Sequence, residues 1–355
     1  MDLLQVKSIS KQDERGFHLS NINFTQAFQQ NITIAGETGS GKTTLLKIIA
    51  GLAQPDMGEV IFRNEKVIGP ADQLIPGNKL IAYLSQDFRL PHFLRVEQIL
   101  EYANEWPTEK AEKLFSLCGI THLFKRRTDE LSGGEQQRIA IARLLIMDPK
   151  LFLLDEPFSN MDPANKDLLK NIFKEIGREF NMSFIMISHD PVDTLPWADE
   201  IIVMKDGKII EKNSPELIYS KPAYSYTAAL FGKYNLLPLE LLQLLNNGVT
   251  IPAGFQPLIR PERCVLVDSA VSGNTIVANT LAGTTVITNK DAFGRGQVFQ
   301  LKGKVVDVRY FGHYFETDLM IGDHTITSRS QFPNSSPQME ETIEIFETDI
   351  HLARI

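Results

Sequence analysis

The stretch GETGSGKT, residues 36 to 43, constrains the fold more than any other part of the sequence. It fits the phosphate-loop pattern G-x-x-x-x-G-K-[ST] at every required position. The apolar run at 32–35 is typical of a buried strand, and residues 44–50 have the apolar spacing of a helix. A strand, a glycine loop and a helix in this order predict a loop that grips phosphate groups. The alternative, an ordinary glycine-rich turn before a helix, accounts less well for this context.

Each part of this loop has an expected role. The glycines let the backbone curl so that several N–H groups point inward, and the helix N-terminus adds partial positive charge. Lys42 can reach the outer phosphates, and the Thr43 hydroxyl can hold Mg²⁺. We therefore expect a nucleotide and Mg²⁺ to be bound here by Gly36, Glu37, Thr38, Gly39, Ser40, Gly41, Lys42, Thr43 and Thr44.

Polar side chains follow three further apolar runs, at the strand ends where open α/β sheets bind ligands. Asp155 and Glu156 follow the run at 151–154. Asp155 can hold Mg²⁺, and Glu156 can polarise an attacking water. Gln86 could reach a metal or a water, and His189 a terminal phosphate. The alternatives are an acidic strand exit and solvated loop side chains.

Two more polar segments begin helices. The string LSGGEQQR at 131–138 places Ser132, Gly133 and Gly134 before a helix with an apolar face. We favour a second anion-binding helix N-terminus, with a simple N-cap as the alternative. Asp162 precedes a proline and is also a good N-cap residue.

The composition of the chain limits the kinds of partner that it is expected to bind. The net charge of −8 and the pI of about 5.5 disfavour a nucleic-acid binder, which usually carries a basic surface. Cys118 and Cys264 are far apart and are expected to be free thiols in a reducing compartment. We find no signal peptide and no apolar run long enough to cross a bilayer. A membrane role would therefore need a partner.

The residue pattern of the sequence changes along the chain. Residues 95–128 have helical spacing and many charges, which predicts a helical insert at about 88–148. From about residue 249, short β-branched runs separated by Gly, Asn and Pro predict a small all-β domain. We expect a nucleotide-binding domain at 1–235 and a β domain at 236–355.

Taken together, these motifs resemble the nucleotide-binding subunit of an ABC transporter in order and spacing over roughly residues 3 to 235. LSGGEQQR is the specific marker. Residues 258–262 and 303–305 resemble the TOBE domain of bacterial import ATPases that serve maltose, ferric iron, polyamines, sulfate and molybdate. The resemblance implies an α/β P-loop ATPase domain, with a RecA-like core and a helical subdomain, followed by a small all-β OB-like or TOBE domain.

The resemblance also implies an ATPase mechanism. Two chains would pair head to tail around two ATP molecules, each site combining the phosphate loop of one chain with the LSGGEQQR segment of the other. Glu156 would be the general base and His189 the γ-phosphate contact, while Asp162 couples the sites. The metal residues would be Thr43, Gln86 and Asp155, the further catalytic residues Lys42 and Gln86, and the residues from the partner Ser132, Gly133, Gly134 and Gln136.

The implied partners are a second ATPase subunit, integral membrane permease subunits and, indirectly, a solute-binding protein, with no nucleic acid. A cytoplasmic permease helix would dock on the helical insert and the loop after Gln86. The chain would be peripheral, at the cytoplasmic face of a bacterial inner membrane. The family's adenine-stacking aromatic falls near Asp13, where Phe17 is a candidate. A soluble ABC ATPase acting on nucleic acid or ribosomes, and an export ATPase, are the alternatives.

Overall fold

The computed structural model describes residues 2–12, 18–87, 90–159, 161–238, 252–267, 277–281, 284–290, 297–331, 337–346 and 349–355. It contains two compact units, Met1–Pro215 and Glu216–Ile355. Within the described ranges, no helix is both long and apolar enough to cross a membrane.

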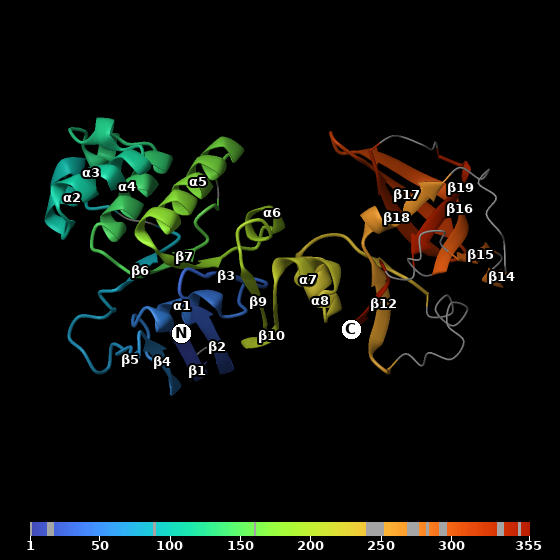
Figure 1. Ribbon diagram of the computed structural model, residues 1–355, viewed down its shortest axis with the longest axis horizontal. Helices are drawn as coiled ribbons and strands as arrows, with labels where there is room; N and C mark the ends of the chain where they lie inside the picture. The colour runs from blue at the N-terminus through green and yellow to red at the C-terminus, as the bar shows by residue number, and fades with distance from the viewer. Residues whose placement is uncertain are drawn as a thin grey trace. The chain divides into compact units, whose positions relative to one another are not determined.

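The first unit is built around a six-stranded sheet in the order β10-β9-β3-β8-β7-β6 (Figure 1). The strands from β9 to β6 run parallel, and β10 pairs antiparallel with β9. The predicted strands before the phosphate loop and before Gln86, Asp155 and His189 are all present. The bounds are β3 (Asn31–Ala35), β6 (Ile81–Leu84), β7 (Leu151–Asp155), β8 (Ser183–Ile187), β9 (Glu200–Lys205) and β10 (Lys208–Asn213).

The central strands are apolar on both faces because both faces are covered. In β7, Leu151 and Leu153 belong to one hydrophobic core, whereas Phe152 and Leu154 belong to another. Successive strand side chains point to opposite faces, so a strand buried on both sides is a continuous apolar run. The four consecutive apolar residues at 151–154 are thus explained by the position of β7 inside a sheet that is covered on both faces.

The core that contains Leu151 and Leu153 lies under α1 (Lys42–Ile49) and a second, antiparallel sheet in the order β2-β1-β4-β5. Leu45, Leu46 and Ile49 bury the apolar face of α1 in it. The phosphate loop therefore begins a helix that is fixed on the sheet. The strands are β1 (Asp2–Gln12), β2 (His18–Ala27), β4 (Met57–Phe62) and β5 (Glu65–Lys66).

The opposite core packs helices against Phe152 and Leu154. The stretch predicted as a helical insert lies between β6 and β7 and supplies most of them (Figure 1). The helices are α2 (Val96–Ala103), α3 (Thr108–Leu117), η1 (Thr121–Leu123), η2 (Thr128–Glu130) and α4 (Gly133–Leu145), followed after β7 by α5 (Pro163–Phe180) and α6 (Pro191–Thr194).

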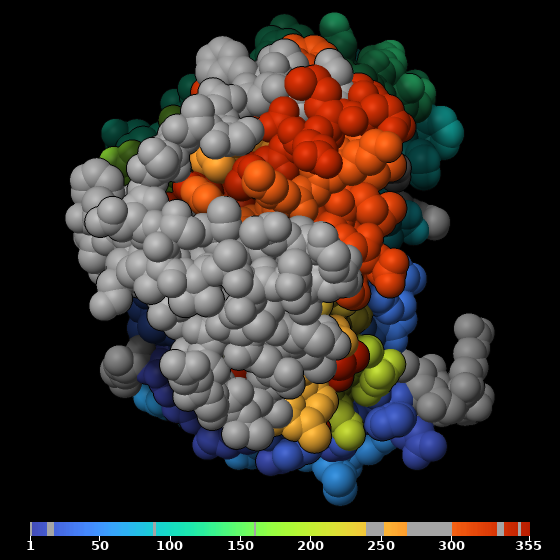
Figure 2. All heavy atoms as spheres, turned by 90° about the vertical axis from the view of Figure 1, so that its right-hand side faces the viewer, coloured from blue at the N-terminus to red at the C-terminus, as the bar shows by residue number. Residues whose placement is uncertain are grey.

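The second unit is mainly antiparallel β-structure, as predicted, and the orange and red atoms of Figure 2 belong to its late strands. One sheet has the order β11-β12-β20; the other has β13-β19-β16-β15-β14, with β17 on β16 and β18 on β17. The predicted boundary at 235 stays a prediction. The elements are α7 (Pro215–Ser220), α8 (Ser225–Leu230), β11 (Asn235–Leu236), β12 (Phe255–Ile259), η3 (Pro261–Arg263), β13 (Val265–Val267), β14 (Val277–Leu281), β15 (Thr284–Lys290), β16 (Gln297–Tyr310), β17 (Phe315–Ile321), β18 (His324–Ser330), β19 (Glu340–Phe346) and β20 (His351–Arg354).

Candidate functional site

The loop between β3 and α1 needs its glycines. Gly36, Gly39 and Gly41 have φ angles of 152°, 87° and 97°, a region that side chains disfavour. At Gly36 a Cβ would also lie 2.3 Å from the carbonyl oxygen of Met204 in β9. The tight curl is therefore encoded by glycine, and β9 closes off the space behind it.

Lys42 lies inside this curl. Its ammonium donates to the carbonyl oxygens of Gly36 at 2.8 Å and Glu37 at 2.7 Å, and to Ser40 Oγ at 3.2 Å. The residue is only 7% exposed. Burial lowers the pKa of Lys42, and the charges of Glu156, Asp155 and Glu37 oppose that shift. A partly buried ammonium surrounded by loop oxygens is suited to an anion such as a phosphate, which would supply nearby negative charge.

Asp155, at the end of β7, is held on both carboxylate oxygens. Thr43 Oγ1 donates to Oδ1 at 3.1 Å, and the Tyr83 hydroxyl donates to Oδ2 at 2.8 Å. Asp155 is 5% exposed. Burial, and then the bond to Asp155, raise the pKa of Tyr83 well above its ordinary value, so this hydroxyl keeps its proton.

The Thr43 hydroxyl and the Asp155 carboxylate fit Mg²⁺, which prefers hard oxygen ligands and usually combines one or two carboxylates with substrate phosphates. Among the described residues, no three His, Cys, Asp or Glu side chains converge as a metal site. A metal would therefore share this pair with a bound phosphate. Gln86, the third predicted metal residue, follows β6 and lines a different pocket.

Glu156 and His189 lie at the ends of neighbouring strands. Glu156 Oε1 is 3.7 Å from His189 Nδ1, a pair that attracts only when the imidazole is protonated. The Glu156 backbone has φ 48°, its N–H donates to the Ile187 carbonyl at 3.2 Å, and its own carbonyl accepts from Ser159 Oγ at 2.9 Å. The carboxylate is thus aimed by a fixed and unusual backbone turn.

The LSGGEQQR segment forms an N-cap. Ser132 caps α4, and the Glu135 carboxylate accepts from the Ser132 N–H at 2.8 Å and its hydroxyl at 2.9 Å. These bonds lower the pKa of Glu135. Gln136 donates to the carbonyls of Thr128 and Leu131, each at 3.2 Å. The simple N-cap, which was the alternative interpretation of this segment, is present. The role of the segment in binding an anion stays a prediction.

The two glycines of this segment have no steric reason within the described chain. A Cβ at Gly133 would meet no described atom within 4 Å, and one at Gly134 would lie 3.8 Å from Asn165 Oδ1. Neither glycine has a positive φ. A simple helix cap would tolerate other residues at both positions.

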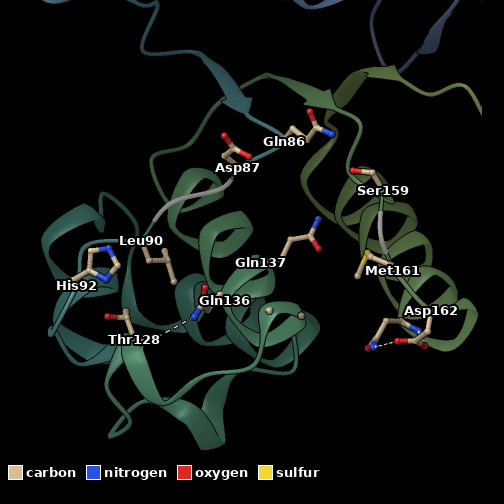
Figure 3. Close-up of a pocket in the computed structure, with 13 residues that line it drawn as sticks. Gln86, Asp87, Leu90, His92, Thr128, Gln136, Gln137, Ser159, Met161 and Asp162 are labelled. Carbon is tan, nitrogen blue, oxygen red and sulfur yellow. Dashed lines mark hydrogen bonds between the residues drawn. The ribbon is translucent and has the colours of Figure 1, made fainter. Parts of the chain in front are cut away.

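The predicted site residues fall into two groups. The phosphate loop, with Thr44 in the first turn of α1, lies with Asp155, Glu156 and His189. Gln86, Gly133, Gly134, Gln136 and Asp162 line a pocket between the end of β6 and the starts of α4 and α5 (Figure 3).

Asp162 caps α5 in this pocket. Its carboxylate accepts from the Asn165 backbone N–H at 3.1 Å and from the Asn165 amide at 2.6 Å, and these bonds lower the pKa of Asp162. The adenine-stacking position near Asp13, and the candidate Phe17, lie outside the described residues.

Sequence reasoning missed Tyr83. A tyrosine in an apolar strand is commonly a core residue, and its hydroxyl partner depends on which strand pairs with β6 and in what register. The only available signal was a polar atom within a strand that ends beside the predicted site.

Comparisons with known proteins identify relatives of this chain. The family described as ABC transporter matches residues 19–159. The chain is 34% identical over 273 residues to the glucose import ATP-binding protein of Saccharolobus solfataricus, covering 74% of this chain and 76% of that protein. It is 28% identical to the spermidine/putrescine import ATP-binding protein of Clostridium acetobutylicum over 99% of this chain and 96% of that protein.

A solved structure of a dimeric bacterial ABC transporter cassette is similar in fold, with a TM-score of 0.52 and 26% identity. The similarity covers 60% of this chain and 98% of that cassette.

Proposed function

Because this chain belongs to the ABC transporter family and is an ABC ATPase, we propose that it binds and hydrolyses ATP to power solute import. The observation that carries the proposal is the joining of Thr43 to Asp155 at 3.1 Å beside the buried ammonium of Lys42. These groups bring a cation, a hydroxyl and a carboxylate to one helix N-terminus, as a Mg²⁺-nucleotide requires.

Each residue then has a defined task. Lys42 binds the outer phosphates, and Thr43 and Asp155 hold the metal. Glu156 accepts the proton of the attacking water at its carboxylate, and His189 donates to an oxygen of the terminal phosphate. Gln86 lines the other pocket, so its role as a sensor of the metal and the water stays a prediction. Bound Mg²⁺ would neutralise charge on the phosphates.

We further propose a head-to-tail homodimer with two composite sites. Each site would take Ser132, Gly133, Gly134 and Gln136 from the partner chain, and Asp162 would couple the two. Support comes from Gly133 and Gly134, which have no steric reason within the described chain, and from the dimeric cassette of similar fold. A partner nucleotide approaching the start of α4 would require this open backbone.

The membrane partners would be permease subunits at the cytoplasmic face of a bacterial inner membrane. A helix from such a subunit would dock on the helical insert, which lies between β6 and β7, and on the loop after Gln86. We propose 1–235 as the ATP-binding domain and 236–355 as a TOBE-like regulatory domain.

Import is favoured over action on nucleic acid or ribosomes. Both relatives described above are import proteins, and the net charge is −8. One of those relatives is named for a neutral sugar and the other for polycations. We therefore expect cargo recognition to reside in the permease and the solute-binding protein.

A mixing experiment tests the composite sites. Lys42→Ala removes the phosphate-binding ammonium, and Gly134→Asp places a charge where the partner's nucleotide would lie. The carboxylate introduced by the second change has room within the chain, so the variant should fold. Each variant alone should hydrolyse ATP poorly, and Lys42→Ala should also bind it weakly. In a mixed dimer, one site combines an intact Lys42 with an intact Gly134, so mixing should restore turnover.

The control is a mixture of two differently tagged Lys42→Ala preparations, which should remain inactive. No restoration between correctly folded variants would overturn the composite site. Absence of ATP hydrolysis in the unmodified chain, alone and with its permease, would overturn the enzymatic proposal itself.

A further inference from the structure

The pairing of β6 with β7 brings Tyr83 to the nucleotide site. Tyr83 pairs with Leu153, and the next β7 residue on the same face is Asp155. Leu153 belongs to the core beneath α1, and Tyr83 packs against that same core. The ring therefore runs along the α1 face of the sheet, and its hydroxyl reaches the carboxylate two residues farther along the neighbouring strand.

The hydroxyls of Tyr83 and Thr43 divide the Asp155 carboxylate between them. Tyr83 donates to Oδ2 at 2.8 Å and Thr43 to Oδ1 at 3.1 Å. Because Asp155 is 5% exposed, bulk water has little access to replace a missing donor. The two bonds together fix the rotation of the carboxylate plane.

The two donors belong to different parts of the structure. Thr43 is in α1 and is itself expected to bind the metal, whereas Tyr83 is in β6, within the sheet. A phenylalanine at position 83 could pack against the same core as the tyrosine ring does. A half-buried hydroxyl costs desolvation free energy unless it finds a partner, and here the partner is Asp155.

We propose that Tyr83 is a positioning residue for the metal-binding carboxylate: its hydroxyl ties the Asp155 carboxylate to β6 and thereby sets the Mg²⁺ affinity of the nucleotide site. This inference rests on the proposed function. Groups that orient a metal ligand commonly change metal affinity by about 10-fold to 100-fold when they are removed.

The test compares Tyr83→Phe with the unmodified protein in the binding of trinitrophenyl-ATP, followed by fluorescence. In EDTA the two proteins should bind this nucleotide equally, because the phosphate loop is intact. In a MgCl₂ titration, Tyr83→Phe should need about tenfold more Mg²⁺ for the half-maximal change. Tyr102→Phe is the matched control, since it removes the same hydroxyl from a side chain that is 77% exposed on α2.

Three outcomes would overturn the inference. The first is a Mg²⁺ titration of Tyr83→Phe that superimposes on that of the unmodified protein. The second is an equal loss of nucleotide affinity in EDTA, which would indicate general damage to the site. The third is a full additional Mg²⁺ shift when Tyr83→Phe is added to Asp155→Asn, because a residue acting through Asp155 should add little there.

Thermal unfolding checks that the variant is folded, and Tyr83→Met, which also lacks the donor, must give the same Mg²⁺ shift. The result is separable from the proposed function. If the unmodified protein hydrolyses Mg-ATP and Tyr83→Phe is unaltered, only the role of Tyr83 fails. If the unmodified protein neither binds nor hydrolyses Mg-ATP, the proposed function fails first.

Discussion

Glu156 combines a partly buried carboxylate with a backbone that few side chains adopt. Its φ of 48° falls directly after the buried end of β7, and two hydrogen bonds fix the turn. Such conformations cost about 1–3 kcal/mol and persist only where the surroundings enforce them. Here the enforced turn keeps the Glu156 side chain 27% exposed, 3.7 Å from His189 Nδ1 and next to Asp155 in the sequence.

Replacing Glu156 by glutamine should separate hydrolysis from binding. Glu156→Gln keeps the shape of the side chain but cannot accept a proton from water, so ATP turnover should fall at least about 100-fold. Trinitrophenyl-ATP binding should persist. Phosphate release and equilibrium fluorescence measure the two quantities, with Glu175→Gln on the exposed face of α5 as the control. Hydrolysis at the normal rate would remove Glu156 from the mechanism.

The placement of site residues was predictable where a side chain and a backbone pattern coincide. Lys42, Thr43 and Asp155 were expected from the phosphate-loop pattern and from an apolar run ending in carboxylates, and the structure joins Thr43 to Asp155 directly. Tyr83 was not expected, because its contact with Asp155 depends on a register between strands that lie far apart in the sequence.

At the scale of elements, the start of α4 holds a reciprocal pair of hydrogen bonds. The Ser132 hydroxyl accepts from the Glu135 N–H at 3.4 Å, and the Glu135 carboxylate accepts from Ser132. These bonds satisfy groups that a helix leaves unpaired at its first turn. The segment predicted to contact the partner's nucleotide is thus already ordered within its own chain.

Removing this carboxylate should loosen the first turn of α4. At pH 7, Glu135→Ala should raise amide hydrogen exchange there about fivefold, corresponding to about 1 kcal/mol. The folded-state pKa of Glu135 lies below its ordinary value of about 4.3. Its contribution is therefore present above about pH 4.3 and is lost as the pH falls through the folded-state pKa.

The measurement is hydrogen exchange by mass spectrometry on peptides covering 128–145 at several pH values. The difference between the two proteins should shrink in acid. Glu109→Ala is the matched control, since Glu109 is also in a first turn but its helix, α3, has no side-chain cap bond. A difference that stays constant down to pH 3 would contradict the role of the carboxylate.

Helices and strands were predictable where the hydrophobic periodicity agrees with the polar and turn residues that flank it. The parallel strands of the first unit are short apolar runs between polar segments, and the β9–β10 hairpin turns at Asp206 and Gly207. The stretch 221–238 contains α8. That helix is held by a distant side chain, which no local pattern could indicate.

At the scale of the whole molecule, that side chain is Arg260 in the second unit. It is 3% exposed, and its guanidinium donates at 3.0 Å to the carbonyls of Tyr219, Ala228, Gly232 and Lys233. Its planar group also lies over the Tyr219 ring, 4.3 Å from the centroid. Arg260, the residue that follows β12, thus holds the whole 219–233 segment against the β-structure.

We expect that a lysine at position 260 cannot hold the 219–233 segment as Arg260 does. Arg260→Lys keeps the charge but loses the planar fork and the ring contact, leaving carbonyl groups without their donor. We expect the 219–233 segment to lose about 2 kcal/mol of local stability, an increase of about 30-fold in its hydrogen exchange. Arg354→Lys, an exposed change in the same unit, is the control. Unchanged exchange in Arg260→Lys would show that the segment is held by other contacts.

The position of β3 has a consequence for synthesis on the ribosome. This strand, which carries the phosphate loop, is flanked by β8 and β9, and β9 also supplies the carbonyl that backs Gly36. Both neighbours are translated long after the loop itself. A nascent chain that ends before Glu200 lacks β9, one of the two strands that flank β3, so its phosphate loop is not yet fully supported. The phosphate loop is therefore translated early but becomes competent only after β9 has been added to the sheet.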